Sequence, residues 1–144
     1  MASGIPPASE FSGLSRKVIE YGEAFEALVA KAKSGLTDAD WAPLEALVDV
    51  DNWERLGTFL GPAETSSWAD YKALVTNYAG NSTWDGTLRH LTEQGNRVIQ
   101  ELTEYNARDG VTNVSNTVTV FEFNDAGKIV HLDVYVMHLE DRPA

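Results

Sequence analysis

The chain has 144 residues and a formal net charge of −11, and it contains no cysteine. The length suits one domain with a single core. The missing cysteine excludes disulfides, thiolate metal sites and a cysteine nucleophile, while the acidic charge disfavours nucleic acids and anionic membranes as partners. Because no apolar run approaches the roughly 20 residues that span a bilayer, and the first 12 residues lack signal-peptide features, we expect a soluble, cytoplasmic protein.

The first third of the chain predicts an arm followed by helices. Residues 1–11 are rich in proline and glycine and poor in apolar side chains, so we expect a flexible N-terminal arm before a single domain at 12–144. From Ser12 to about Gly35, apolar residues recur at spacings of three and four, which is typical of an amphipathic helix.

Two more helices are expected before residue 81. Asp40 is a candidate N-cap for a helix that carries Trp41, and Ser67 is a candidate N-cap for a third helix with Asp70 three residues later. Between them, residues 53–60 indicate a short extended segment.

After residue 81 the apolar period changes from helical spacing to two, which predicts strands. The expected strands are 82–93 and 97–106, followed by a long hairpin over 114–138 whose turn is Asn124-Asp125-Ala126-Gly127-Lys128. Helices first and a four-stranded antiparallel meander second indicate an α+β fold.

The hairpin sequence Phe121-Glu122-Phe123-Asn124-Asp125-Ala126-Gly127-Lys128-Ile129, together with the order of the elements, resembles the NTF2-like superfamily, which includes ketosteroid isomerase and the SnoaL-like cyclases. This resemblance implies a cone in which three N-terminal helices pack in a strongly curved antiparallel sheet around an apolar pocket. It also implies a homodimer through the outer sheet face. It does not fix the reaction, since the superfamily includes enzymes and proteins that only bind.

Alternation along the strands predicts which side chains enter the pocket, once the phenylalanines before the turn are placed inside by the resemblance. The inward set is then Thr117, Thr119, Phe121, Phe123, Val130, Leu132, Val134, Val136 and His138. The outward set is Asn116, Val118, Val120, Glu122, His131, Asp133, Tyr135 and Met137. A bulge of one residue would exchange the two sets.

Glu101 is the first candidate base. The resemblance places Ile99, Glu101 and Thr103 inward on the neighbouring strand, and a carboxylate in an apolar pocket either pairs with a cation or becomes a weaker acid that suits proton transfer. The alternative is a structural ion pair with Arg89 or Arg97.

Glu54 is the second candidate base. In the isomerases a catalytic carboxylate follows the second helix and precedes a glycine, and Trp53-Glu54-Arg55-Leu56-Gly57 resembles that placement. The oxyanion-binding Asp of those enzymes would fall at Thr119, and Tyr21 is one or two turns from their tyrosine position, which disfavours steroid isomerisation. Glu54 as a solvated charge beside Arg55 is the alternative.

The histidines supply candidate acids. His138 is inward by alternation, and His90 lies in a region where some NTF2-like dehydratases carry a catalytic histidine; either is alternatively a structural residue. His131 and Asp133 are expected on the dimer side.

These residues favour a cofactor-independent acid–base enzyme acting on a small apolar, aromatic or polyketide-like compound by isomerisation, dehydration, cyclisation or lyase chemistry. Glu54 or Glu101 would be the base, His138 or His90 the acid, and Arg89 an oxyanion partner. The expected substrate-binding residues are Trp53, Tyr71, Trp84, Thr119, Phe121, Phe123 and Val134. We expect no metal and no cofactor; the alternative function is non-catalytic binding of a small hydrophobic ligand.

Overall fold

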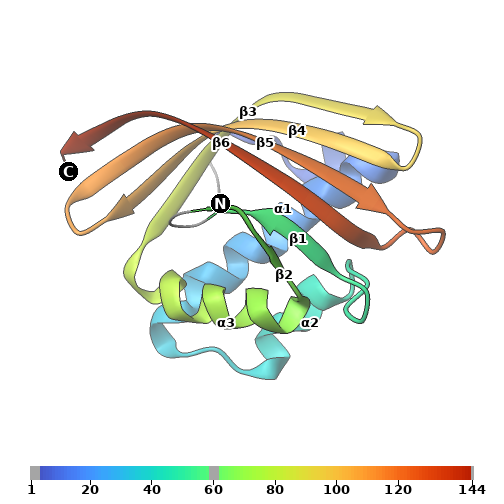
Figure 1. The fold of residues 1–144 in the computed structure, drawn as a ribbon, viewed down its shortest axis with the longest axis horizontal. Coiled ribbons are helices and arrows are strands. Elements are labelled where there is room, and N and C mark those ends of the chain that lie inside the picture. Colours follow the sequence, from blue (N-terminus) through green and yellow to red (C-terminus); the bar gives the residue numbers. More distant parts are fainter. Residues whose placement is uncertain (1–3, 59–61, 144) are drawn as a thin grey trace.

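A curved six-stranded sheet dominates the computed structural model, which describes residues 4–58 and 62–143 (Figure 1). Four long antiparallel strands form a meander: β3 (Thr83–Gln94), β4 (Arg97–Arg108), β5 (Val111–Phe123) and β6 (Ile129–Pro143). The short strands β1 (Glu54–Gly57) and β2 (Glu64–Ser66) extend the sheet in the order β2-β1-β6-β5-β4-β3, with β1 parallel to β6. The predicted α+β class and the four-stranded meander are confirmed.

Three α-helices lie against the concave face of this sheet (Figure 1). They are α1 (Gly13–Lys31), α2 (Asp38–Glu45) and α3 (Trp68–Tyr78), and three short 3-10 helices adjoin them: η1 (Ala8–Glu10), η2 (Ala32–Ser34) and η3 (Ala79–Asn81). No helix in the described part of the chain combines the length and the apolar character needed to cross a membrane.

The helix starts match the sequence prediction except at α2. Ser67 caps α3 as expected, because its hydroxyl accepts the Asp70 backbone N–H at 3.2 Å. Asp40, predicted as the N-cap of α2, is instead the third helical residue, and Thr37 is the cap. The Asp40 carboxylate accepts the Thr37 backbone N–H at 2.9 Å, so it completes a capping box from inside the helix.

Residues 4–11, which the sequence predicts as a flexible arm, contact the edge strand β3 in the structure. Gly4 donates its N–H to the Gly86 carbonyl at 3.2 Å and accepts the Leu88 N–H at 2.9 Å, and Ala8 is buried. The reason is that β3 is the edge strand of the sheet, and its exposed backbone groups find partners in this segment. Residues 1–3 lie outside the described ranges.

Side-chain alternation on β5 follows the prediction, whereas alternation on β4 is the reverse of it. Phe121 and Phe123 are buried on the inner face. On β4, however, Val98 and Leu102 are the buried residues and Ile99 is 37% exposed. The two strands pair without a bulge and place Val98 opposite Phe121. The predicted register of β4 was therefore off by one residue, and every β4 side chain was assigned to the wrong face of the sheet.

Two bulges set the faces of β6. A register shift next to Glu122 makes Ile129 the buried residue instead of the predicted Val130, while Leu132 lies inward as expected. Val136 pairs with buried Thr117 yet is 47% exposed, because the C-terminal half of β6 extends past the helices (Figure 1).

Candidate functional site

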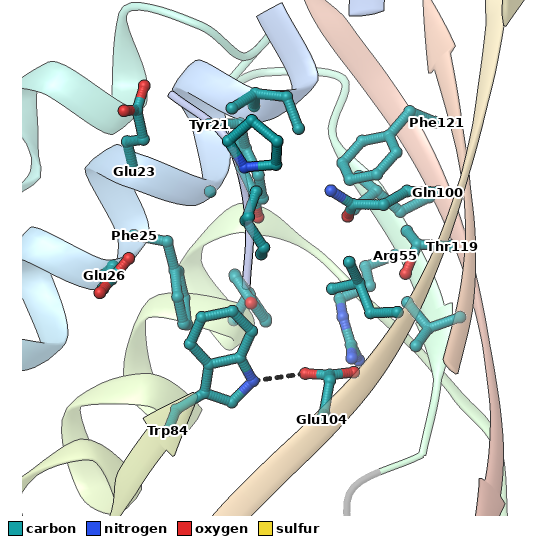
Figure 2. A pocket seen from close by; sticks show the side chains of 18 residues that line it. Tyr21, Glu23, Phe25, Glu26, Arg55, Trp84, Gln100, Glu104, Thr119 and Phe121 are labelled. Carbon is teal, nitrogen blue, oxygen red and sulfur yellow. Dashed lines mark hydrogen bonds between the residues drawn. The ribbon is translucent and has the colours of Figure 1, made fainter. Parts of the chain in front are cut away.

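A cavity of about 190 Å³ lies between α1 and the concave face of the sheet (Figure 2). The N-terminal segment contributes Ile5 and Pro6 to its wall, and α3 contributes Tyr71. The wall is mostly apolar and includes Ile19, Phe25, Trp84, Leu102, Phe121, Leu132 and Val134. Its polar residues are Tyr21, Glu23, Glu26, Arg55, Tyr71, Gln100, Glu104 and Thr119.

Arg55 supplies a buried cation to this cavity. It is 8% exposed, and its guanidinium carbon lies 5.2 Å from the centroid of the Tyr71 ring. The guanidinium lies over Gly57 on the same face of β1, where an added Cβ would be 2.9 Å from Nη1. Only glycine leaves room at residue 57 for the observed position of Arg55.

Glu104 supplies a carboxylate on the inner face of β4. Its Oε1 accepts the indole N–H of Trp84 at 2.5 Å, and Figure 2 shows both side chains pointing into the cavity. Trp84 lies over Gly86 much as Arg55 lies over Gly57, because a Cβ at Gly86 would be 2.8 Å from the indole Cη2. The carboxylate is thus held by a fixed ring.

Two buried phenols, Tyr21 and Tyr71, line the same cavity. Burial raises the pKa of Tyr21 well above its ordinary value, Tyr71 raises it further, and Arg55 opposes the rise. Among residues 4–58 and 62–143 the buried Tyr21 hydroxyl has no hydrogen-bond partner, although Tyr71 is near enough to act on its pKa. Tyr21 is therefore a neutral O–H donor at physiological pH.

The pKa of Tyr71 is affected by both charged residues of the site, Arg55 and Glu104. Burial raises its pKa, Arg55 lowers it and Glu104 raises it, so the guanidinium and the carboxylate both act electrostatically on this ring. A cation, a carboxylate and neutral phenols thus share one small, largely apolar space. Such a set can bind a substrate oxygen through N–H and O–H donors and accept a proton at a carboxylate.

Five of the predicted substrate-binding residues occupy the cavity wall: Tyr71, Trp84, Thr119, Phe121 and Val134. Their placement is as expected, and their role in binding stays a prediction. Trp53 and Phe123 do not line the cavity. Trp53 packs in the aromatic core with its ring centroid 4.8 Å from that of Trp68, and Phe123 is buried in the same core.

The predicted inward position of Glu101 is wrong. Glu101 pairs with His90 and Val118 across the sheet and lies on the outer face, since its neighbours Gln100 and Leu102 are the buried ones. His90 is exposed, and Arg89 is exposed at a register shift in β3. None of these three residues reaches the cavity.

Glu54 is also outside the cavity, because alternation along β1 turns Arg55 inward and leaves Glu54 exposed. Its Oε1 lies 3.0 Å from His131 Nδ1, and His131 Nε2 lies 2.8 Å from Asp133 Oδ1 on the outer face. His138 lies beyond the helices at the far end of β6, half-exposed, with its Nδ1 2.8 Å from the Asn113 amide.

Three inward residues of the site were not predicted from the sequence: Arg55, Gln100 and Glu104. Tyr21 is on the apolar face of its helix as the spacing predicts, but its role in the site was not predicted. One signal could have found Arg55. In Arg55-Leu56-Gly57 and Trp84-Asp85-Gly86 a large side chain precedes a glycine by two residues, and such a glycine leaves room for the larger neighbour on the same face. In the described part of the chain no three His, Asp or Glu side chains are arranged to hold a metal.

No protein-family model and no curated protein matches this sequence, whereas solved structures match its fold. An NTF2-like protein from Burkholderia xenovorans LB400 superposes with a TM-score of 0.59 at 17% identity, over 82% of this chain and 89% of that chain. This chain has the NTF2-like fold. Another solved NTF2-like protein of unknown function, from Exiguobacterium sp. 255-15, superposes with a TM-score of 0.59 at 15% identity, over 81% of this chain and 98% of that one.

Solved structures of this NTF2-like group also include proteins described as enzymes. An LEH-like epoxide hydrolase from Mycobacterium tuberculosis matches with a TM-score of 0.55 at 18% identity, over 82% of this chain and 83% of that chain. A protein assigned to the SnoaL-like polyketide cyclases, from Mesorhizobium loti, matches with a TM-score of 0.54 at 15% identity, over 79% and 97%. Identities at this level show the fold alone.

Proposed function

We propose that this NTF2-like protein is a cofactor-independent acid–base enzyme acting on a small, mostly apolar carbonyl compound in the cavity. The observation that carries the proposal is that the Glu104 carboxylate, the Arg55 cation and the neutral Tyr21 phenol line one cavity. The reaction class is one that starts with removal of a proton next to a carbonyl, which isomerisation, dehydration, cyclisation and lyase steps share.

Glu104 is the proposed base in place of Glu54 and Glu101. Its carboxylate takes the proton from the carbon beside the carbonyl. The electron pair of that C–H bond forms the C=C bond of an enolate, and the π pair of the carbonyl moves onto the oxygen. The hydrogen bond from Trp84 fixes the orientation of the carboxylate through its Oε1 atom. Because Glu104 is on a strand of the sheet, its backbone holds the base in a fixed position relative to the rest of the cavity wall.

Tyr21 and Arg55 are the proposed groups that stabilise the developing oxyanion. A phenol with a raised pKa keeps its proton at neutral pH and donates a hydrogen bond to the oxygen. The guanidinium adds a positive charge in a space with little water, where Coulomb interactions are strong. Phe121, Val134 and Thr119 would hold the apolar body of an aromatic or polyketide-like substrate.

Hydrogen–deuterium exchange tests this function without knowledge of the complete reaction. Aryl and cyclic ketones incubated with the protein in D₂O should gain deuterium beside the carbonyl faster than without protein, as measured by mass spectrometry. Tyr21→Phe should slow the exchange by about 10²-fold, the usual effect of removing one oxyanion donor. Exchange no faster than in the heat-denatured sample across the panel would contradict the proposal.

Non-catalytic binding of a small hydrophobic ligand is the second candidate. It is favoured by the hydrogen bond that already occupies Glu104, since a structural carboxylate beside a buried cation would look the same. If the protein only binds its ligand, ketones should raise its melting temperature, and their exchange in D₂O should stay at the background rate.

We also propose a homodimer through the outer face of the sheet. Tyr135 and Met137 are 60% and 64% exposed there, and they neighbour the outward Val118 of β5. Exposed aromatic, methionine and aliphatic side chains of this kind are common at the centre of subunit interfaces.

A further inference from the structure

We propose that the substrate is elongated: an oxygen-bearing head occupies the cavity, and an uncharged or positively charged tail lies in a groove along α1. This inference rests on the proposed function, which places the substrate in the cavity. It adds the shape and the charge of the substrate.

The groove is a separate hollow of about 490 Å³ between α1 and the start of β3. It adjoins the cavity, because four residues line both spaces: Glu23, Phe25, Glu26 and Trp84. The groove alone is lined by Ala27, Val29, Ala30, Lys33, Ser82 and Thr83. In Figure 2, Phe25 and Trp84 stand together on the side of the cavity opposite Gln100 and Thr119.

The size of the cavity requires a second space. Small-molecule sites usually measure about 300 to 1,000 Å³, and the cavity holds about 190 Å³. A ring with a carbonyl fits such a volume, whereas a compound of ordinary substrate size must extend beyond it. The groove that shares the cavity's rim is large enough for the remainder.

The two aromatic rings that line both spaces, Phe25 and Trp84, are each held in place by neighbouring residues. Phe25 is stacked between Tyr21 and Tyr71, with ring centroids 6.5 and 6.2 Å away. Trp84 is held by the Glu104 carboxylate and lies over Gly86. Because these two rings are already fixed, the protein loses little conformational freedom when a tail binds against them.

Charge selects the kind of tail. Glu23 and Glu26 line the junction, and the groove offers one cation, Lys33, among the residues that line it. The net charge of −11 adds to the negative potential. Phosphate and carboxylate tails are therefore disfavoured, while alkyl and ammonium tails match the alanine-rich floor and the acidic rim.

Acetophenone and three derivatives test this inference. The derivatives carry a six-carbon chain at the para position that ends in methyl, ammonium or carboxylate. Dissociation constants follow from quenching of tryptophan fluorescence, with thermal shift as a second readout. The methyl-ended chain should bind at least about tenfold more tightly than acetophenone, since each buried methylene contributes about 0.8 kcal/mol. The ammonium-ended chain should bind about fivefold more tightly than the carboxylate-ended chain.

Tryptophan substitutions locate the tail. Ala27→Trp and Ala30→Trp fill the groove at exposed helix positions and leave the cavity wall intact. They should weaken binding of the methyl-ended derivative about tenfold and leave acetophenone unchanged. Ala39→Trp on α2 is the matched control, exposed and outside both spaces, and should alter neither ligand. Glu23→Gln should reduce the preference for ammonium over carboxylate.

The outcomes separate this inference from the proposed function. If ketone exchange in D₂O is catalysed but chain length, chain charge and the groove substitutions leave the affinities unchanged, the elongated substrate is wrong and the acid–base enzyme stands. If chained ketones bind through the groove without catalysed exchange, the shape inference stands and the enzyme is wrong. If no chained ketone binds, the inference fails.

Discussion

The inner and outer faces of the same sheet carry charged groups of the same kinds in opposite circumstances. On β1, Glu54 is exposed and joins the outer cluster with His131 and Asp133, while its neighbour Arg55 is buried in the cavity beside Tyr71. On β4, Glu101 is on the outer face and Glu104 is in the cavity. The face of the sheet, and not the type of residue, decides which of these groups reaches the cavity and can take part in the proposed chemistry.

The comparison teaches that an outer-face cluster can resemble a catalytic set in its distances alone. His131 lies between two carboxylate oxygens at 3.0 and 2.8 Å. Its surroundings are open, however, and the shallow hollow beside it has few apolar side chains. Water screens charges there, whereas in the cavity Arg55 is buried against the Tyr71 ring.

The largest expected effect separates neighbours on β1. Arg55→Met keeps an apolar stem and removes the cation, so ketone exchange in D₂O should fall by about 10²-fold or more. Glu54→Gln changes the outer face only and should leave the exchange rate unaltered. Circular dichroism establishes that both variants are folded. Equal effects of the two substitutions would abolish the distinction between the faces.

Gly57→Ala tests how the inner face positions its cation. The new methyl group would lie 2.9 Å from Arg55 Nη1 and 3.1 Å from the Val134 Cβ. We expect a loss of about 1 to 3 kcal/mol in the free energy of unfolding, typical of overpacking, and slower exchange because Arg55 is displaced. Gly80→Ala is the control, since its nearest contact would be 3.9 Å away. Denaturant unfolding measures both; a Gly57→Ala protein as stable and as active as wild type would refute the packing argument.

Charge reversal on the outer face should affect association and not chemistry. Asp133→Lys places a cation next to the exposed Tyr135 and should raise the dimer dissociation constant about tenfold, because like or unpaired charges at an interface are costly. Asp125→Lys in the exposed turn is the control. Light scattering at low micromolar concentration measures the mass. An unchanged dimer mass in a folded Asp133→Lys protein would rule out this face as the interface.

The smallest effect concerns the loop that leads into β1. Hydrogen bonds from Asn52 and Asn124 lower the pKa of Asp49 below its ordinary value, and the Asp49 N–H donates to the Ile129 carbonyl. A lowered folded-state pKa means that the carboxylate stabilises the fold above its unfolded pKa and loses this contribution as pH falls through the folded value.

Asp49→Asn should therefore lower the melting temperature slightly near neutral pH and match the wild-type protein in acid. Thermal melts from neutral pH to below about pH 3, compared with Asp125→Asn in the exposed turn, measure this dependence. A constant difference between Asp49→Asn and wild type at every pH would contradict the assigned role of the ionised carboxylate.

The fold could be predicted because its signals are local. The Asn124 turn, the period of two on either side of it and the Ser67 cap each act within a few residues. The candidate site could not be predicted, because the face of a strand depends on register with its neighbour. A shift of one residue on β4 exchanged Glu101 for Glu104, and alternation on β1 exchanged Glu54 for Arg55.

The N-terminal segment shows a second limit of sequence reasoning. Residues 4–10 have weak periodicity of their own, and their order comes from the edge of β3 and the mouth of the cavity. Such contacts are between distant parts of the chain, which no local pattern records. Tyr21 lies on the apolar face of its helix, yet its importance depends on Tyr71 and Arg55, which the fold brings beside it.

Two glutamates on one strand give the most direct test of the central claim. Glu104→Gln and Glu101→Gln make the same chemical change on opposite faces of β4. Rates of ketone exchange in D₂O, taken with melting temperatures, should show a loss of about 10²-fold or more for Glu104→Gln and a normal rate for Glu101→Gln. A folded Glu104→Gln protein that exchanges as fast as wild type would contradict the account.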